Sequence, residues 1–421
     1  MKHSTTRPAS QTPPHAAERY EATVMFAIGF FFFPVTVLAA LQVWIVAVIG
    51  TLAILALRVW RGSAHIPLRA PLPILLASVI VWGFITWFWS IAPDHTIYTA
   101  IRLVMVALCL VVLTDTAAHL DTSRRKRFGV WLVAGTVAGL LLTAAMIVTN
   151  GEFAGWLGME VQRGHELDRL NRTSGVIAIL VWPVALVVAK MLGRWIAALV
   201  IALAALALFS LSPSTPVLAF VAGAGAFAVA WMSPIWAMRL LLIAFAASIA
   251  MVPLLDQIVP TMNEFLIANI SAPNSEVHRF VIWRFAAERI LEHPLLGWGM
   301  DSARAIPGGD TELFLFQVGE DVTTGPALPL HPHNALIQIW LELGLVGLLL
   351  AGGLFALAVS SISQRPGNRA GPAACAAAIA SALAIAQLSF GIWQGWWMST
   401  LGLVAVVVIA TTWTGSHYGQ T

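Results

Sequence analysis

Apolar residues fall along the chain in blocks, with short polar stretches between them. A helix rises about 1.5 Å per residue, so the blocks, of about 17 to 25 residues, are long enough to cross the hydrocarbon of a membrane. They lack the alternation that is typical of barrel strands. The pattern predicts an all-α polytopic membrane protein with about twelve spans. These lie near residues 22–38, 41–59, 71–90, 97–115, 128–149, 173–190, 195–210, 215–232, 238–256, 334–361, 371–390 and 394–413.

The first two predicted spans are separated by only a few residues. Pro34 lies within the first of them, and residues 39–41 are the joint between the two. Because proline interrupts the hydrogen bonding of a helix, one long broken helix would also fit this region.

Composition supports the membrane assignment. Apolar residues make up 59% of the chain and charged residues only 10%, against roughly 25% charged residues in an ordinary soluble domain. Residues 1–21 are polar and rich in proline, which indicates a disordered tail and not a signal peptide. Cys109 and Cys375 both fall within predicted spans, which argues against a disulfide framework or a zinc knuckle.

Basic residues gather on the same side of the predicted spans as the N-terminus. All lysines (Lys2, Lys126 and Lys190) lie there, and the positive-inside rule makes that side cytoplasmic. The formal net charge of +3 then reflects topology, and we expect no nucleic-acid partner. We expect a cytoplasmic tail at 1–21, spans one to nine within 22–256 with a short outer loop at 150–172, a large outer loop at 257–332 between spans nine and ten, spans ten to twelve within 333–413, and a cytoplasmic tail at 414–421.

The two outer loops contain arginine but no lysine. A planar guanidinium can bind a diphosphate with two parallel hydrogen bonds, which an ammonium cannot do. Arg172, at the mouth of the sixth span, is therefore a candidate anion ligand, or else an interfacial anchor whose charge reaches the headgroups. The candidates in the two loops are Arg163, Arg169, Arg172, Arg279 and Arg284.

A helix is expected near the start of the large loop. Asn274 or Ser275 would cap it, and it would end near Glu292, before Pro294. The stretch 294–299, Pro-Leu-Leu-Gly-Trp-Gly, predicts a tight turn in which glycine allows close approach of another backbone.

Helical periodicity separates the two arginines of this expected helix. Arg279 falls on an apolar stripe with Trp283 and Ile290, where a buried guanidinium needs either a ligand or a salt bridge. Arg284 forms an ordinary i,i+4 pair with Glu288 on the other side. Arg279 is therefore the better candidate for ligand binding.

Two histidines, His331 and His333, directly precede the tenth predicted span. An unperturbed pKa of about 6.5 suits a histidine to proton transfer near neutral pH. His333 would open the span at the level of the headgroups, followed by Asn334. It is a candidate general base, and a plain polar anchor is the alternative.

The tenth predicted span carries Glu342, Gly344 and Gly347. A carboxylate within a membrane is a functional candidate, although it can also pair with an arginine or hold a helix contact. The two glycines favour close packing between spans.

Several motifs are absent from the sequence. There is no Walker motif, no dinucleotide fingerprint, no HExxH and no carboxylate cluster suited to a divalent metal. We therefore expect no cofactor and no metal, and we expect neither nucleotide-driven transport nor zinc hydrolysis.

At this point the chain resembles a known family, the O-antigen ligases, within the wider ligase and polymerase superfamily of bacterial surface glycans. The signature is His333-Asn334, nine residues, then Gly344-Leu345-Val346-Gly347. Upstream, Arg279 and Trp283 followed by residues 294–299 resemble the family's loop motif, and Asn171-Arg172-Thr173 is similar to its other arginine site.

The resemblance implies an inverting membrane glycosyltransferase without a metal. Such an enzyme transfers a polysaccharide from undecaprenyl diphosphate to a sugar hydroxyl of lipid A-core during lipopolysaccharide assembly. Its active site would lie on the periplasmic side of the bacterial inner membrane, among membrane lipids, with the large loop in the periplasm. By the same resemblance His333 is the general base, and Arg172 and Arg279 bind the donor diphosphate. Weaker site candidates are Arg163, Arg169, Arg284, Asn334 and Glu342.

Three other functions remain open. An O-antigen polymerase uses the same donor, but its loops often carry paired Arg-x10-Gly motifs, and no outer arginine here has a glycine at that spacing. A protein O-oligosaccharyltransferase is similar around His333 but usually has a longer C-terminal region. A lipid or solute transporter tends to show internal repeats and charges midway across its spans, whereas this sequence shows no convincing repeat and most of its candidate charges cluster at the outer rim.

Overall fold

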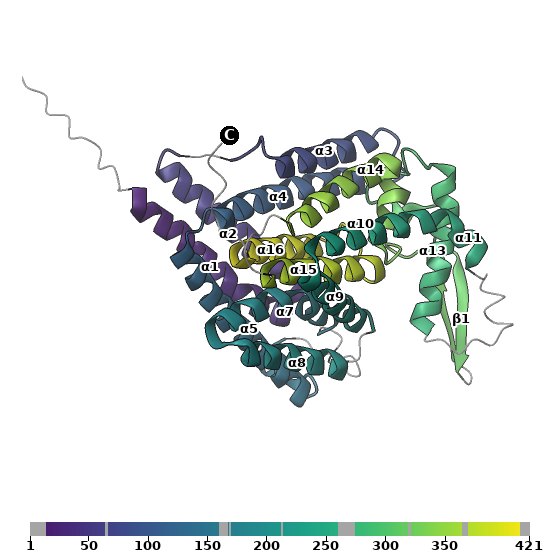
Figure 1. The fold of residues 1–421 in the computed structure, drawn as a ribbon. Helices are drawn as coiled ribbons and strands as arrows, with labels where there is room; N and C mark the ends of the chain where they lie inside the picture. Colours follow the sequence, from purple (N-terminus) through teal and green to yellow (C-terminus); the bar gives the residue numbers. More distant parts are fainter. Residues whose placement is uncertain are drawn as a thin grey trace, which may run out of the picture.

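The computed structural model describes residues 14–63, 66–159, 167, 170–211, 214–259, 274–318, 321–363 and 369–412. Helices account for nearly all of this part, so the all-α polytopic class is confirmed (Figure 1). The helices are α1 (Pro14–Ala39), α2 (Val43–Trp60), α3 (Pro71–Thr86), α4 (Pro93–Ala118), α5 (Thr122–Val148), α6 (Glu152–Trp156), α7 (Leu170–Leu192), α8 (Arg194–Leu211), α9 (Ser214–Met232), α10 (Pro234–Met251), α11 (Leu255–Ile258), α13 (Asn274–Glu292), α14 (Ala335–Ser360), α15 (Ala370–Leu388) and α16 (Gly395–Thr412), with 3-10 turns η1 (Ala40–Gln42), η2 (Val252–Leu254) and η3 (Ala303–Ala305).

Ten stretches of the described residues are long and apolar enough to cross a membrane. One of them, Arg19–Trp60, is not a single helix, because Ala39 leaves helical geometry and α2 folds back along α1 until Gly50 faces Ile28. The first two spans are therefore a hairpin, which decides against one broken helix. The stretch Arg19–Trp60 therefore contributes two helices, α1 and α2, and α3 is a shorter apolar helix. Each predicted span then has a matching helix.

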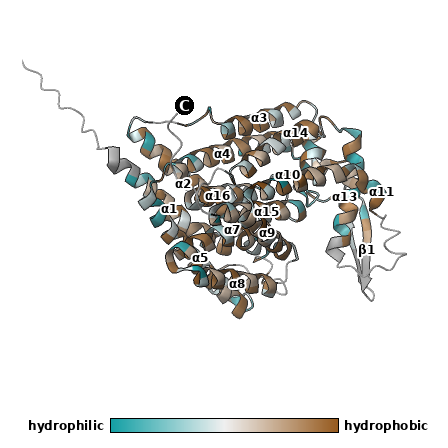
Figure 2. Cartoon of the chain, viewed as in Figure 1, coloured by the Kyte–Doolittle hydropathy of each residue, from teal (hydrophilic) through white to brown (hydrophobic). Residues whose placement is uncertain are grey.

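Helix α7 forms the centre of the bundle. Residues 173–188 are buried without interruption, and α7 packs against α8, α9, α15 and α16 (Figure 1). Trp182 of α7 stacks on Phe220 of α9 with ring centroids 5.2 Å apart, and its Nε1 donates to Ser381 of α15 at 3.0 Å. The outer helices present large exposed apolar side chains, as a surface in lipid requires. Figure 2 shows the helices coloured largely brown, the hydrophobic end of the scale.

Helix α14 is interrupted at Gly344, where the backbone adopts φ 66° and ψ −166°. The carbonyl groups of Leu341 and Glu342 accept hydrogen bonds of 2.9 and 2.8 Å from backbone N–H groups of residues 294–299. An added Cβ at Gly344 would overlap the backbone of this loop. The predicted tight approach of the loop is confirmed, but Gly344 accommodates the loop and not a neighbouring span, so the prediction of span packing is wrong for it.

Helix α13 and a small antiparallel hairpin project from one end of the bundle, beside α11 (Figure 1). The predicted extent of α13 is confirmed. The hairpin, β1 (Glu312–Val318) and β2 (Asp321–Pro326), was not predicted. The continuous apolar and aromatic run at 313–316 and the β-branched run at 322–324 are the signals that indicate it.

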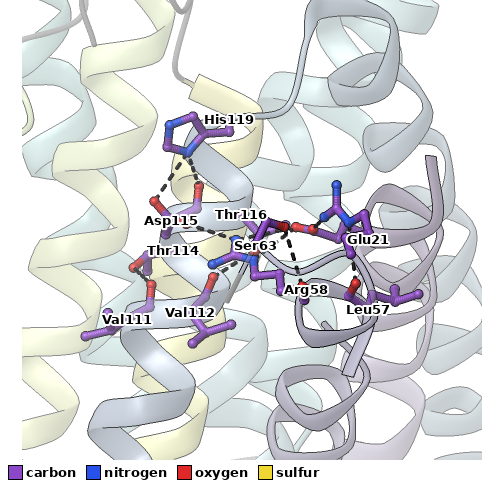
Figure 3. A network of polar contacts seen from close by, with 11 residues as sticks. Glu21, Leu57, Arg58, Ser63, Val111, Val112, Thr114, Asp115, Thr116 and His119 are labelled. Carbon is purple, nitrogen blue, oxygen red and sulfur yellow. Dashed lines mark hydrogen bonds and ion pairs between the residues drawn. The ribbon is translucent and has the colours of Figure 1, made fainter. Parts of the chain in front are cut away.

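At the opposite end, α1, α2 and α4 meet in a charged cluster (Figure 3). Arg58 donates to Asp115 at 2.9 Å and pairs with Glu21 at 3.4 Å, and Arg61 also pairs with Glu21. His119 lies 3.3 Å from Asp115, whose hydrogen bond raises the pKa of this histidine. We call these residues the Arg58 cluster. It gathers at one end of the bundle four charged residues that the charge pattern assigned to one side of the membrane.

Candidate active site

The signature residues stand where the chain enters α14. Asn334 caps this helix, since its Oδ1 accepts hydrogen bonds of 3.0 Å from the backbone N–H groups of Leu336 and Ile337. His333 lies directly before the cap with φ 55°, in the left-handed region that non-glycine residues seldom occupy. Such backbone strain is typical of positions whose orientation matters for function.

The ring of His333 is held in one tautomer. Its Nδ1 lies 2.8 Å from the carbonyl oxygen of Ser389, in the connection between α15 and α16. A carbonyl can only accept, so Nδ1 carries the proton and Nε2 is left as an acceptor. Burial lowers the pKa of His333, against the effect of Ser389, and the charges of Arg279 and His278 lower it further. The imidazole is therefore neutral near pH 7, as a general base must be.

His331 packs directly against His333, with ring centroids 4.4 Å apart. Its Nδ1 accepts from the backbone N–H of His333 at 3.2 Å, and its Nε2 lies 3.1 Å from Nε2 of Gln394. Burial, then the charges of His333 and Arg304, lower the pKa of His331 to about 3. The signature spacing selects His333 and leaves His331 out, but the structure places His331 against His333, where its Nδ1 accepts from the His333 backbone.

Arg172 reaches this group from the start of α7. Its guanidinium carbon lies 5.9 Å from the ring centroid of Trp396. Nε1 of Trp396 donates to Oε1 of Gln394 at 2.9 Å, and Gln394 in turn contacts His331. Among the described residues, the guanidinium of Arg172 has no ion pair with a carboxylate.

Arg279 approaches from α13, on the other side. Its Nη1 donates to the Thr215 hydroxyl at the start of α9 at 3.5 Å, and its charge lowers the pKa of His333. Trp283, one turn further along α13, donates through Nε1 to the carbonyl of Pro332 at 2.8 Å. The predicted apolar stripe is confirmed, because Ile290 is buried in the same cluster as Trp283. The structure thus places the charge of Arg279 near His333 and links Arg172 to the histidine pair through Trp396 and Gln394.

Of the weaker arginine candidates, the structure describes Arg284, which does not contact the histidines. Arg284 forms the predicted pair with Glu288 at 3.3 Å and donates to the carbonyl of Val259 at 2.6 Å, so it holds α13 to α11. Arg163 and Arg169 lie outside the described residues.

Glu342 is fully buried and acts as a junction. Its carboxylate accepts from the backbone N–H groups of Asp301 and Ala303, from the Gln338 amide at 3.0 Å, and from Nε1 of Trp393. The sequence left three roles open for Glu342: a functional group, a partner for an arginine, or a helix contact. The described contacts match the last of these, because they hold neighbouring segments together. Gln338 extends the junction, since its Oε1 accepts from the Ile392 N–H at 2.9 Å.

Sequence reasoning missed the connection between α15 and α16. Ser389 and Gln394 contact His333 and His331 directly, and Trp396 carries the contact to Arg172. The available signal was a glutamine between two glycines in an aromatic-rich outer loop, residues 390–397, on the same side of the predicted spans as the signature histidine. No group of three or more His, Cys, Asp or Glu side chains in the described part of the chain is placed to hold a metal ion.

The fold and this site define a polytopic helical membrane protein with a histidine and arginine centre at one end of its bundle. The family model described as O-antigen ligase matches residues 197–352, which include Arg279, His333 and Glu342. A protein of Rickettsia conorii named "Putative polysaccharide ligase" is 28% identical over 321 residues, 76% of this chain and 74% of its own length. Its namesake in Rickettsia felis is 28% identical over 346 residues, 79% of this chain and 80% of the relative. The resemblance to the O-antigen ligase family is thereby confirmed.

Proposed function

We propose that this protein is an O-antigen ligase, which transfers a polysaccharide from undecaprenyl diphosphate to a sugar hydroxyl of lipid A-core. The names of the family and of the relatives support the class of reaction. One observation carries the assignment of chemistry. His333 presents an unprotonated Nε2 because its Nδ1 is committed to the Ser389 carbonyl at 2.8 Å, and Arg172 and Arg279 stand on either side.

The proposed reaction needs one proton transfer and one displacement. Nε2 of His333 takes the proton from the acceptor hydroxyl as its oxygen attacks the anomeric carbon of the donor sugar. The bond between that carbon and the diphosphate oxygen breaks, and undecaprenyl diphosphate leaves with both electrons. Attack from the face opposite the diphosphate inverts the anomeric configuration.

Arg172 and Arg279 supply the positive charge that this leaving group requires. Fixed guanidiniums stabilise charge that develops in the transition state without reorganising at that moment. Both guanidiniums are held by aromatic or hydroxyl contacts, Trp396 for Arg172 and Thr215 for Arg279. We propose that they serve in place of a metal ion.

An apolar cavity beside the site suits the lipid part of the donor. Its volume is about 550 Å³, and it opens between α10, α13, α14 and α15, next to Asn334. Met251, Trp283 and Leu388 are among its lining residues. We propose that the isoprene units nearest the diphosphate lie here, with the membrane supplying the rest of their surroundings.

The division of the chain between the two sides of the membrane is part of the proposal. The end that carries His333 and α13 would face the periplasm, and the end with the Arg58 cluster would face the cytoplasm of a bacterial inner membrane. Labelling single cysteines with an impermeant reagent on spheroplasts tests this. We expect labelling at Pro307→Cys and none at Arg125→Cys, and the reverse pattern would contradict the assignment.

The activity is tested by incubating purified protein with an undecaprenyl-diphosphate glycan and lipid A-core. We expect a joined product on a gel, without nucleotide and in the presence of EDTA. His333→Ala should abolish it, whereas His95→Ala, an exposed histidine at the start of α4, should not. If the glycan were instead extended on a second donor molecule, the protein would be a polymerase.

A further inference from the structure

A second pair of arginines flanks the histidines. Arg102 of α4 and Arg304 of η3 meet around the buried Asp301. Arg304 pairs with one carboxylate oxygen of Asp301 at 3.2 Å, while the Thr99 hydroxyl donates to the other at 2.7 Å. Arg102 donates to the same Thr99 hydroxyl at 3.0 Å. We call Thr99, Arg102, Asp301 and Arg304 the Asp301 cluster.

The Asp301 cluster has a net positive charge. It contains two guanidiniums and one carboxylate, and the nearby Glu342 is already occupied by four hydrogen-bond donors. Nε of Arg102 is buried and has no hydrogen-bond partner among the described residues. A buried donor of a charged group without an acceptor is unfavourable, and an anionic ligand would satisfy it.

The cluster lies beside the histidine pair but on different elements from the donor arginines. The charge of Arg304 reaches the ring of His331. A Cβ added at Gly395 would lie 3.5 Å from Cδ of Arg102, and the neighbouring Gln394 contacts His331. Arg172 and Arg279 approach instead from α7 and α13.

We propose that Arg102 and Arg304 bind an anionic group, a phosphate or a carboxylate, on the acceptor glycan. This rests on the proposed ligase function and adds to it two positioning residues, Arg102 and Arg304, which would favour an acidic acceptor over a neutral one. Two guanidiniums hold the acid by charge-assisted hydrogen bonds and so orient the attacking hydroxyl toward His333. Donor and acceptor are then each held by their own arginine pair, on either side of the histidines.

The proposal is tested with full-length protein in nanodiscs of neutral phosphatidylcholine, with lipid A-core and its dephosphorylated, decarboxylated counterpart as acceptors. With the acidic acceptor, Arg102→Gln should raise the KM for acceptor by about tenfold or more and leave the KM for donor within twofold. Arg304→Gln should act in the same direction. With the neutral acceptor, wild type and Arg102→Gln should have the same KM. Arg239→Gln, an exposed arginine that lies over Trp236 as Arg102 lies over Tyr98, is the matched control.

Three outcomes would overturn this assignment. An equal loss with both acceptors would mean that Arg102 only supports the fold, and a raised KM for donor would place it in the donor site. A dependence on anionic phospholipid in the nanodisc, and not on acceptor charge, would make Arg102 a headgroup anchor. Binding of fluorescent lipid A-core to wild type and Arg102→Gln is measured in parallel. If lipid A-core binding depended on Arg102 but no ligation occurred, the proposed function alone would be refuted. If binding did not depend on Arg102, this proposal would be refuted.

Discussion

The two polar ends of the bundle use arginine in opposite ways. In the Arg58 cluster, Arg58 and Arg61 are matched by Glu21 and Asp115 in ion pairs. At the signature end, Arg172 lies over the indole ring of Trp396, and Arg279 donates to the Thr215 hydroxyl. Among the described residues, Arg172 forms no ion pair with a carboxylate. The first end uses its arginines to hold the fold, whereas we propose that Arg172 and Arg279 at the second end bind a ligand.

The largest expected effect is the loss of the base at the signature end. His333→Ala should lower turnover by about 10² to 10⁴-fold, the usual contribution of positioned proton transfer. The KM for donor should change little, since the arginines and the apolar cavity remain. Steady-state kinetics with both substrates measure this. Near-normal ligation by the variant would require another base.

The arginines of the signature end come next. Arg172→Ala and Arg279→Ala should each lower turnover by about 10²-fold and weaken donor binding as well, because they contact the diphosphate in both ground and transition states. Lysine should rescue poorly, since it lacks the bidentate fork. Arg194→Ala, an exposed arginine next to Trp195, serves as control. A variant that binds donor with unchanged affinity would remove that arginine from the diphosphate site.

At the other end, the same kind of change should alter stability and not chemistry. Arg58→Ala leaves Glu21 and Asp115 without their shared partner, and breaking a buried ion pair costs about 3 to 5 kcal/mol. We expect a lower midpoint of thermal unfolding in detergent and unchanged KM values for the remaining active protein. The exposed Arg69→Ala should change neither quantity. If Arg58→Ala raised the KM for donor, the contrast between the two ends would fail.

The smallest effect is a dependence on pH at the signature end. The pKa of His331 is about 3 in the folded protein, against about 6.5 when unfolded. Below pH 6.5 the unfolded chain therefore takes up a proton that the folded chain refuses, and stability falls as pH decreases toward 3. The midpoint of thermal unfolding should drop between pH 7.5 and 5 in wild type, and drop less in His331→Gln. If the midpoint of thermal unfolding dropped equally with pH in both proteins, His331 would not be the group responsible.

Hydrophobic blocks predicted the spans well because lipid leaves the backbone no alternative to helix. Two further sequence features pointed to His333 and Arg279: the spacing of His333 from Gly344, which carries the resemblance, and the apolar stripe on which Arg279 lies. The charge of Arg279 acts on His333 in the structure. What could not be predicted depends on partners distant in sequence. Three features arise only when the outer connections pack together: the Ser389 carbonyl that orients His333, the position of His331 in the site, and the contact of Thr99 with Asp301. No local pattern contains that information.

The interruption of α14 has a consequence for the order of assembly. The carbonyl groups of Leu341 and Glu342 are satisfied by residues 294–299, and these precede α14 in the chain and lie outside the predicted spans. During synthesis this loop therefore leaves the ribosome before the helix that it completes. Hydrocarbon penalises unpaired carbonyl groups, so we expect α14 to adopt its interrupted form only when the loop docks on it. The histidine that opens α14 would then gain its final setting late, after most of the protein has been inserted.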